Sequence, residues 1–289
     1  MFKLSNAEIN KVAHTSYSDE FLDMMRKWYD PDLHKGKDLE QLLLHNVRPD
    51  NLHGVMYQHI LNHTKVEGRS VLEVGCGSGQ NVESWYRAGA AKITTLDIDE
   101  FPVEITKQRC KDLGIDNTTI IHADFISHEF DEQFDIVNCV QVIEHVGKEN
   151  QVEALIKLLD LTKINGVIFI QIPNRSCIID AHDSRLPFAH WLPRKISAPY
   201  ARLFGRTPPV WEPMAYGRVK RILEENGGEI LSKVDLCRTV NEFIDYRVNK
   251  RRSFKNIVFA GVVLFLYPFL RGNINSILPN INIFVRKVR

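Results

Sequence analysis

The sequence lacks several features that would place a protein in other functional classes. Its apolar C-terminal stretch, 257–270, has fourteen residues, whereas a membrane-spanning helix needs about twenty. The five cysteines are scattered without a C-x-x-C pair, which favours reduced thiols over a disulfide framework. The phosphate-binding pattern G-x-x-x-x-G-K-[ST] is absent. A formal net charge of +1 argues against a chain that binds nucleic acid as a whole. Because the first residues have no apolar signal-peptide core, we expect a cytoplasmic protein.

The chain does contain enough apolar residues for a large core, since 44% of its 289 residues are hydrophobic. From residue 66 onward, strand-like and helix-like patterns alternate, which is typical of a parallel sheet with helices on both faces. Continuous apolar runs such as 167–170 suit strands that are buried on both faces. We predict strands at 70–74, 92–97, 118–122, 134–140, 166–171, 229–236 and 281–287, and helices near 79–89, 101–113, 149–162 and 214–226.

The alternating pattern is preceded by a different region and interrupted twice. Residues 1–65 are polar-rich, with apolar residues at helical spacing, and predict an N-terminal helical lid or substrate region. The larger domain, 66–289, carries insertions at 174–213 and 240–280. The first insertion has too many large apolar groups to be a linker in water.

Residues 71–79, V-L-E-V-G-C-G-S-G, are the most informative stretch. An apolar strand runs into a turn with glycine at 75, 77 and 79, where glycine permits positive φ and leaves room for a ligand. The spacing differs from the dinucleotide pattern G-x-G-x-x-G. The next predicted strand ends at Asp97, where an acid can bond both hydroxyls of a ribose. These two elements together predict a nucleoside site.

Five motifs follow in a fixed order: VLEVGCGSG (71–79), TLDID (95–99), HADF (122–125), FDIVNCVQVIEHV (134–146) and NGVIFIQIPN (165–174). In these motifs, over roughly 66–175, the chain resembles the class I S-adenosylmethionine-dependent methyltransferases. The resemblance implies an α/β fold with a Rossmann-like seven-stranded sheet, helices on both faces, and S-adenosyl-L-methionine as cofactor.

The resemblance also implies a role for each motif residue. Gly75, Gly77 and Gly79 would admit the aminoacyl and ribose portion of the cofactor. Glu73 would face its ammonium group, directly or through water.

The remaining implied contacts involve the nucleoside. Asp97 would bind the ribose hydroxyls, and Ile98 would pack on the adenine. Asp124 would accept from the adenine amine, beside Phe125.

The segment Q-V-I-E-H-V at 141–146 follows the fourth strand, at the edge where ligands bind in such sheets. Here the chain is similar to the ubiquinone-type O-methyltransferases, whose E-x-x-E-H pattern can hold a divalent metal. Gln141 replaces the first glutamate and removes one charge, so a metal is possible but not favoured. Gln141 would instead cover the cofactor near the methyl group. We predict His145 as general base with Glu144 orienting it; the alternative is that Glu144 caps the next helix and His145 is a packing residue.

Two segments combine apolar and basic residues. A basic flank beside the short apolar stretch, together 249–271, suits a membrane surface, and the aromatic segment 187–204 with its interleaved cations offers a second contact. Burial of the stretch, in the core or in a homodimer, is the alternative.

The leading functional hypothesis is O-methylation of a small acceptor, which can be lipophilic or lipid-linked, such as a quinone-type phenol. The stretch Trp-Tyr-Asp-Pro at 28–31 is loosely similar to the N-terminal pattern of the quinone family. Alternatives are a sugar hydroxyl in cell-surface glycan synthesis, RNA 2′-O-methylation, and a non-catalytic cofactor-binding partner of a membrane complex. N-methylation also stays open, and no nucleic-acid partner is expected.

Overall fold

The structure is a computed structural model that describes residues 4–29, 38–47, 63–180, 183–233, 261 and 280–289. The strands are β1 (Ser70–Val74), β2 (Lys92–Asp97), β3 (Thr118–His122), β4 (Phe134–Val140), β5 (Thr162–Pro173), β6 (Gly228–Lys233) and β7 (Asn280–Lys287). The helices are α1 (Asn6–Ala13), α2 (Asp19–Trp28), α3 (Leu39–Val47), α6 (Gln80–Arg87), α7 (Glu100–Leu113), α8 (Gln151–Asp160), α9 (Arg194–Leu203) and α10 (Tyr216–Glu225), with a 3-10 turn, η1 (Ala189–Trp191).

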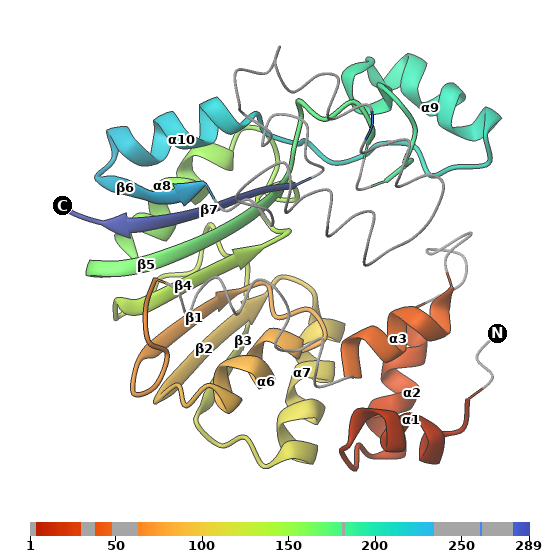
Figure 1. Ribbon diagram of the computed structural model, residues 1–289, viewed down its shortest axis with the longest axis vertical. Coiled ribbons are helices and arrows are strands. Elements are labelled where there is room, and N and C mark those ends of the chain that lie inside the picture. Colours follow the sequence, from red (N-terminus) through yellow and green to blue (C-terminus); the bar gives the residue numbers. More distant parts are fainter. Residues whose placement is uncertain (1–3, 30–37, 48–62, 181–182, 234–260, 262–279) are drawn as a thin grey trace.

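One seven-stranded sheet organises the described part of the chain, in the order β3-β2-β1-β4-β5-β7-β6 (Figure 1). The first five strands in the sequence are parallel, and β7 runs antiparallel between β5 and β6. Because the carboxyl ends of the parallel strands share one edge, the segments that follow β1, β2, β3 and β4 meet there. The predicted α/β sheet with helices on both faces is confirmed.

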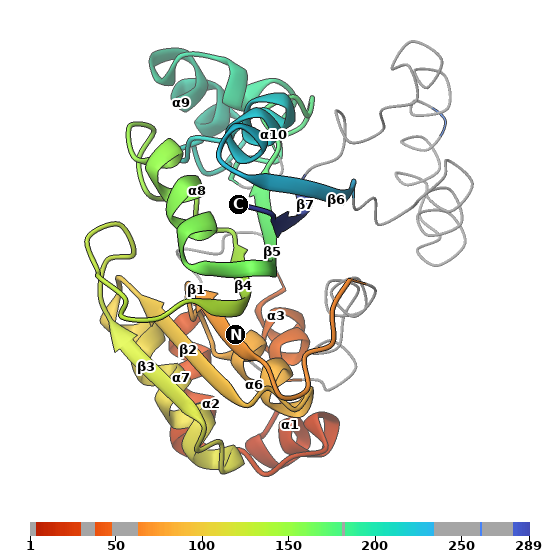
Figure 2. The same cartoon turned by 90° about the vertical axis from the view of Figure 1, so that its left-hand side faces the viewer.

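The two faces of the sheet have separate apolar cores, as Figure 2 shows with helices on either side. Leu72 and Val74 of β1 pack with α8 and α10, whereas Val71 packs with Val82 and Trp85 of α6. This division follows the period of two in a strand, which sends successive side chains to opposite faces.

The N-terminal helices form a third layer against α7. Their buried residues, including Phe21 and Leu43, share one cluster with Ile105 of α7. The first two helices have N-capping residues: Ser5 and Glu8 form a capping box at α1, and Ser18 caps α2.

Some boundaries differ from the sequence-based expectation. The helix expected to reach 162 ends at Asp160, and β5 begins at Thr162 rather than 166. Thr162 pairs with Phe134 across a register shift, so β5 starts before its apolar run. Of the strand expected at 229–236, residues 234–236 lie outside the described residues, as do almost all of the insertion 240–280 and the segment 249–271. No helix in the described part is long and apolar enough to cross a membrane.

The described residues of the insertion 174–213 contact one another and the turn after β4. The two ends of the insertion lie side by side, because Arg175 N donates to Met214 O at 3.0 Å. Between them, η1 and α9 stand beyond the sheet edge, at the upper right of Figure 1.

Candidate active site

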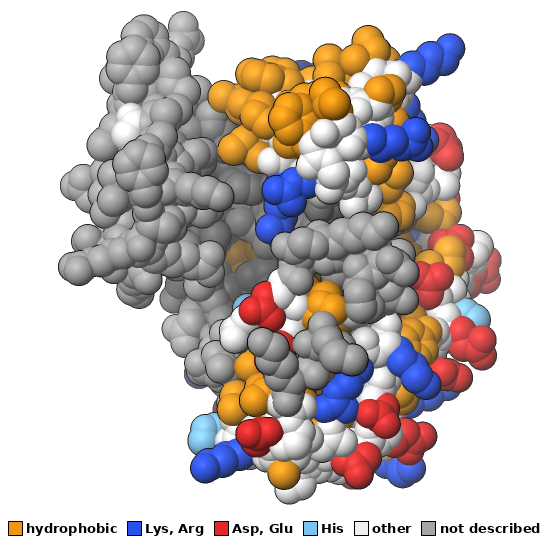
Figure 3. All heavy atoms as spheres, turned by 90° about the vertical axis from the view of Figure 1, so that its right-hand side faces the viewer, with side chains coloured by type: hydrophobic (Ala, Val, Ile, Leu, Met, Phe, Trp, Pro, Cys, Tyr) orange, Lys and Arg blue, Asp and Glu red, His pale blue; other side chains and the backbone are white. Residues whose placement is uncertain are grey.

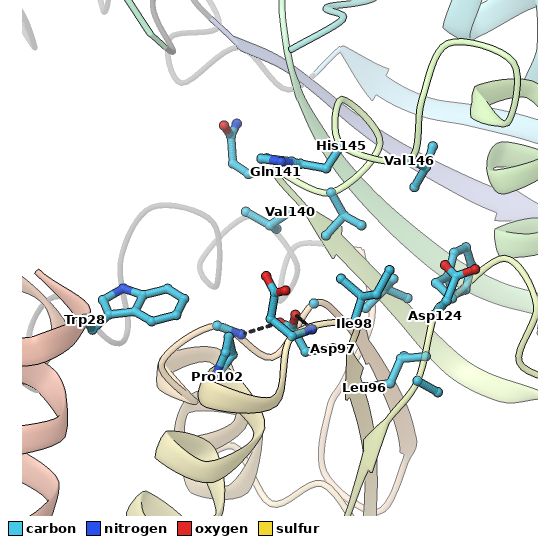
Figure 4. A pocket seen from close by; sticks show the side chains of 17 residues that line it. Trp28, Leu96, Asp97, Ile98, Pro102, Asp124, Val140, Gln141, His145 and Val146 are labelled. Carbon is cyan, nitrogen blue, oxygen red and sulfur yellow. Dashed lines mark hydrogen bonds between the residues drawn. The ribbon is translucent and has the colours of Figure 1, made fainter. Parts of the chain in front are cut away.

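A cavity of about 410 Å³ opens at the carboxyl ends of β1, β2, β3 and β4 (Figure 4). Pockets for small ligands usually fall in the range of about 300–1,000 Å³. Its lining comprises Trp28, Val74, Gly75, Gly77, Leu96, Asp97, Ile98, Asp99, Pro102, Ala123, Asp124, Phe125, Val140, Gln141, Val142, His145 and Val146. Eight of the eleven residues predicted for the site therefore lie at one cavity.

The turn after β1 requires glycine at its first position. Gly75 has φ +81°, and a Cβ there would lie 2.6 Å from Val142 Cγ2. Gly77, also at positive φ, donates its backbone N–H to Asp97 Oδ2 at 3.2 Å. Gly79 does not line the cavity; it begins α6 at φ +75°, where a Cβ would lie 3.2 Å from Thr106. Gly75 and Gly77 thus bring backbone, rather than side chains, to the cavity wall.

Asp97 presents a carboxylate at the end of β2. Its oxygens accept from Gly77 N and Asp99 N, both at 3.2 Å, which fixes the side chain at the cavity wall. The next residue, Ile98, is 63% exposed and also lines the cavity. A fixed acceptor beside an uncovered apolar side chain suits a ribose next to a flat base.

The loop after β3 supplies Asp124 and Phe125. Asp124 accepts from Ile126 N and Ser127 Oγ, both at 3.1 Å. From α8, Lys157 Nζ donates to the carbonyls of Ile126 and His128 at 2.7 Å and lies 5.5 Å from the centre of the Phe125 ring. The loop is therefore held from α8 by a half-buried lysine, a contact that the sequence did not reveal.

Glu73 is turned away from the cavity. It is fully buried and accepts from Asn81 Nδ2, Trp85 Nε1 and Asn138 Nδ2 at 2.7–2.8 Å. Burial raises the pKa of Glu73 to about 7, against these three hydrogen bonds, which favour the ionised form. The direct approach to an ammonium group expected from the resemblance has no counterpart in this geometry, because Glu73 is not among the lining residues.

His145 lines the cavity from the turn after β4, and Glu144 lies behind it. His145 is 37% exposed, while Glu144 is buried with Oε1 3.8 Å from His145 Nε2. The Trp211 ring, from the insertion, lies against the His145 ring at a centroid distance of 3.9 Å. The alternative that Glu144 caps the next helix is wrong, because Asn150 occupies the N-cap position of α8.

Gln141 adopts a left-handed conformation, with φ +58°. Its backbone N donates to Gln171 O at 2.9 Å and its side-chain amide to Gln171 Oε1 at 3.3 Å. Among the described residues, no three His, Cys, Asp or Glu side chains gather as a metal ion would require.

Trp28, at the end of α2, reaches the cavity from the N-terminal helices, opposite Asp97 and Gln141 in Figure 4. Its ring centre lies 6.3 Å from that of Phe101. The sequence signal for this residue is the Trp-Tyr-Asp-Pro stretch, which did not by itself indicate a cavity wall.

These features together fit a nucleoside. Glycine backbone admits the ligand, Asp97 offers an acceptor to hydroxyls, and Ile98 with Phe125 offers apolar surface to a base. The fit rests on the missing Cβ atoms and on the fixed carboxylate.

Comparison with known proteins agrees with this geometry. Residues 71–166 match the family model described as a methyltransferase domain. The chain is 30% identical over 168 residues to a ubiquinone biosynthesis O-methyltransferase of Pasteurella multocida, covering 55% of this chain and 64% of that protein. It is 31% identical over 173 residues to the protein of the same name from Actinobacillus pleuropneumoniae, covering 58% and 68%. The matches thus span about two thirds of these relatives.

A solved structure gives the same fold. An S-adenosylmethionine-dependent methyltransferase from Mesorhizobium loti superposes with a TM-score of 0.57 at 14% identity, covering 81% of this chain and 98% of that one. The ordered motifs, the sequence relatives and this shared fold show that the chain belongs to the class I S-adenosylmethionine-dependent methyltransferases.

Proposed function

We propose that the protein methylates a hydroxyl group of a small acceptor. The observation that carries this proposal is that a histidine, His145, and the fixed carboxylate Asp97 line one cavity. Relatives at about 30% identity named as O-methyltransferases support the same reaction class.

Residues of the cofactor side, which we define as 75–79, 97–99 and 123–125, would hold the cofactor. Asp97 would bind the ribose hydroxyls, Ile98 and Phe125 would pack on the adenine, and Asp124 would accept from its amine. Glu73 would act from below, by holding α6 and the end of β1 in place. When bound, S-adenosylmethionine supplies a methyl group whose bond to sulfur breaks as a carbon–oxygen bond forms.

Residues of the acceptor side, which we define as 140–146 and Trp211, would act on the acceptor. His145 would take the proton of the attacking hydroxyl, because a phenol with a pKa near 10 is otherwise mostly protonated at neutral pH. Glu144, 3.8 Å away, would stabilise the protonated imidazole, and Trp211 would hold the ring in place. Most of the catalytic effect would come from orientation of the two reactants.

The surface of the insertion supports a lipophilic acceptor taken from a membrane surface. At the end of α9, Leu203 is 81% and Phe204 57% exposed, and Ile196 is 54% exposed. Arg194, Lys195 and Arg202 are exposed among them, and residues 184–211 contain no Asp or Glu. Figure 3 shows apolar and basic side chains together at the end of the molecule where α9 lies. Exposed aromatics among cations suit the interface of an anionic bilayer.

The acceptor class is tested by incubating the protein with radiolabelled S-adenosylmethionine and a cell extract, and then separating lipid, glycan and RNA fractions. We expect label in the lipid fraction. Label in glycan or RNA would replace the acceptor by a sugar or a ribose hydroxyl. Tight cofactor binding without transfer into any fraction would favour a non-catalytic role.

Membrane contact is tested by flotation with vesicles of phosphatidylglycerol and phosphatidylcholine. We expect flotation with the anionic vesicles, and its loss when Leu203→Glu and Phe204→Glu are combined. A control pair on α10, Glu225→Gln with Lys220→Gln, should float like the wild type. Equal flotation of the Leu203/Phe204 variant would contradict the proposed surface.

A further inference from the structure

A fully buried arginine that does not line the cavity bonds to three segments: the glycine turn after β1, α6 and α3. Arg109, on α7, is 0% exposed. Its Nε donates to Ser78 O at 2.8 Å, in the glycine turn. One terminal nitrogen donates to Glu83 Oε2 on α6 at 2.7 Å, and the other to Asn46 O on α3 at 3.1 Å. Because the guanidinium is planar and rigid, these bonds fix the three segments relative to one another.

The N-terminal helices complete the surroundings of this charge. Tyr17 OH donates to the same Glu83 oxygen at 2.8 Å, and the guanidinium carbon lies 5.4 Å from the Tyr17 ring centre. The Phe21 ring on α2 lies 4.9 Å from it. Removing these groups would leave a buried charge with fewer partners, which is costly. The charge therefore favours docked N-terminal helices.

The glycine turn has further bonds to the N-terminal helices. Ser78 Oγ donates to Asn46 Oδ1 at 2.8 Å, and Gln80 Nε2 donates to His45 O at 3.3 Å. The same helices place Trp28 in the cavity lining. The glycine turn, which would contact the cofactor, is thus bonded to the N-terminal helices that supply Trp28 to the cavity lining.

We infer that Arg109 is a positioning residue that couples occupancy of the cofactor site to docking of the N-terminal helices. The inference rests on the proposed cofactor site. Arg109 does not line the cavity, so it acts through the Ser78 carbonyl and through Asn46. If docking shapes the turn, then a ligand on the turn stabilises docking by the same factor, since coupling between two sites is reciprocal.

The test uses S-adenosylhomocysteine as probe, with calorimetry for affinity and hydrogen exchange by mass spectrometry for docking. In the wild-type chain we expect the probe to slow exchange in residues 6–47. Arg109→Met should weaken binding by about 10-fold or more, within the usual range of coupling between sites. It should also abolish the ligand-dependent protection of 6–47, while exchange in β4 and β5 stays unchanged.

The matched control is Arg87→Met. Arg87 contacts the same Glu83 carboxylate, at 2.8 Å, but lies at the surface and makes no bond to the turn in the described contacts. It should keep wild-type affinity and wild-type protection. Tyr17→Phe keeps the ring and removes the hydroxyl, so it serves as a milder variant should Arg109→Met not fold; it should show the same loss of protection to a smaller degree.

Wild-type affinity in a folded Arg109→Met protein, or equal losses in Arg87→Met, would overturn the inference. Loss of affinity with protection of 6–47 intact would do the same, because a purely structural role gives that pattern. If the wild-type chain does not bind the probe, the proposed function fails instead. Hydrogen exchange without ligand then distinguishes failure of the proposed function from failure of the inference. Faster exchange of the N-terminal helices in Arg109→Met would still show that Arg109 holds these helices.

Discussion

On the cofactor side of the cavity, the polar groups are tied to the fold by hydrogen bonds, whereas on the acceptor side the exposed groups are mainly aromatic and apolar. Asp97 accepts one hydrogen bond from the turn after β1 and one from its own loop, and Asp124 accepts two from its own loop. The acceptor side instead places His145 against Trp211, and continues into an insertion with Leu203 and Phe204 on its surface.

Under the proposed function, this difference separates a part that would hold a common cofactor from a part that would meet a particular acceptor. A cofactor shared by many enzymes is best bound by backbone and by fixed carboxylates, which tolerate little change. An acceptor that differs from one enzyme to the next is best bound by a segment that lies outside the sheet, because such a segment can change without disturbing the strands. The insertion 174–213 is such a segment, since its removal would leave every strand pair intact.

The largest expected effect lies on the acceptor side. His145→Ala should lower kcat by a factor of about 10²–10⁴, because the hydroxyl loses its proton acceptor. Affinity for S-adenosylhomocysteine, measured by calorimetry, should stay within about twofold. His190→Ala, in the insertion but with its ring nitrogen on Arg175 O, is the control and should retain activity. Full activity of His145→Ala would remove this residue from the chemistry.

The next effect concerns Glu73, beneath the cofactor side. With a pKa of about 7 in the folded chain and an ordinary value of 4.5, Glu73 binds more protons folded than unfolded between these pH values. The free energy of unfolding should therefore fall as pH rises from 4.5 to 7, by about 3 kcal/mol from this group. Urea unfolding at pH 5, 6, 7 and 8 measures it, and Glu73→Gln should lack this part of the slope. Parallel slopes for both proteins would show that Glu73 titrates normally.

A smaller effect is expected at Asp97, where a substitution should lower cofactor affinity. Asp97→Ala should weaken S-adenosylhomocysteine binding by about 2 kcal/mol, or roughly 30-fold, since a charged acceptor of hydroxyl hydrogen bonds is lost. Asp97→Asn keeps an oxygen for Gly77 N and should lose less. Calorimetry of both variants, with the acceptor KM as a second measurement, distinguishes the two sides of the cavity. Equal affinity in the wild type and Asp97→Ala would contradict the cofactor assignment.

The smallest effect tests the support behind the loop after β3. Lys157→Met removes two hydrogen bonds to the Ile126 and His128 carbonyls and should weaken cofactor binding by about 1 kcal/mol, roughly fivefold. Lys163→Met, an exposed lysine paired with Asp135, is the control. If the two variants bind equally well, the loop keeps its shape without Lys157.

The sequence predicted the strands and the glycine turn well because both are local patterns. Apolar runs and glycine spacing are read over five to ten residues, and the resulting sheet brought Asp97, Asp124 and His145 to one edge. Glu73 and Gly79 are the two predicted cofactor residues that the structure places outside the cavity lining. Glu73 is fully buried. It shares a face with Val71, and the period of two in β1 directs it toward Trp85 rather than into the cavity.

The contacts that sequence reasoning missed depend on distant partners. Tyr17 and Arg109 are 92 residues apart, and Trp211 reaches His145 from the far end of an insertion. A charged residue on the buried side of α7, beside Ile105 and Cys110, was the available signal for Arg109. Its partners could not be named, because pattern and spacing do not specify which helices pack together.

The adjoining ends of the insertion have a practical consequence. Since Arg175 and Met214 are joined by a backbone hydrogen bond, the chain enters and leaves this segment at one point. A segment with such a junction can be exchanged for its counterpart from a related enzyme, or shortened to a turn, without altering the path of the sheet. Under the proposed function, we expect grafts of this kind to change acceptor preference while the order of the seven strands stays the same.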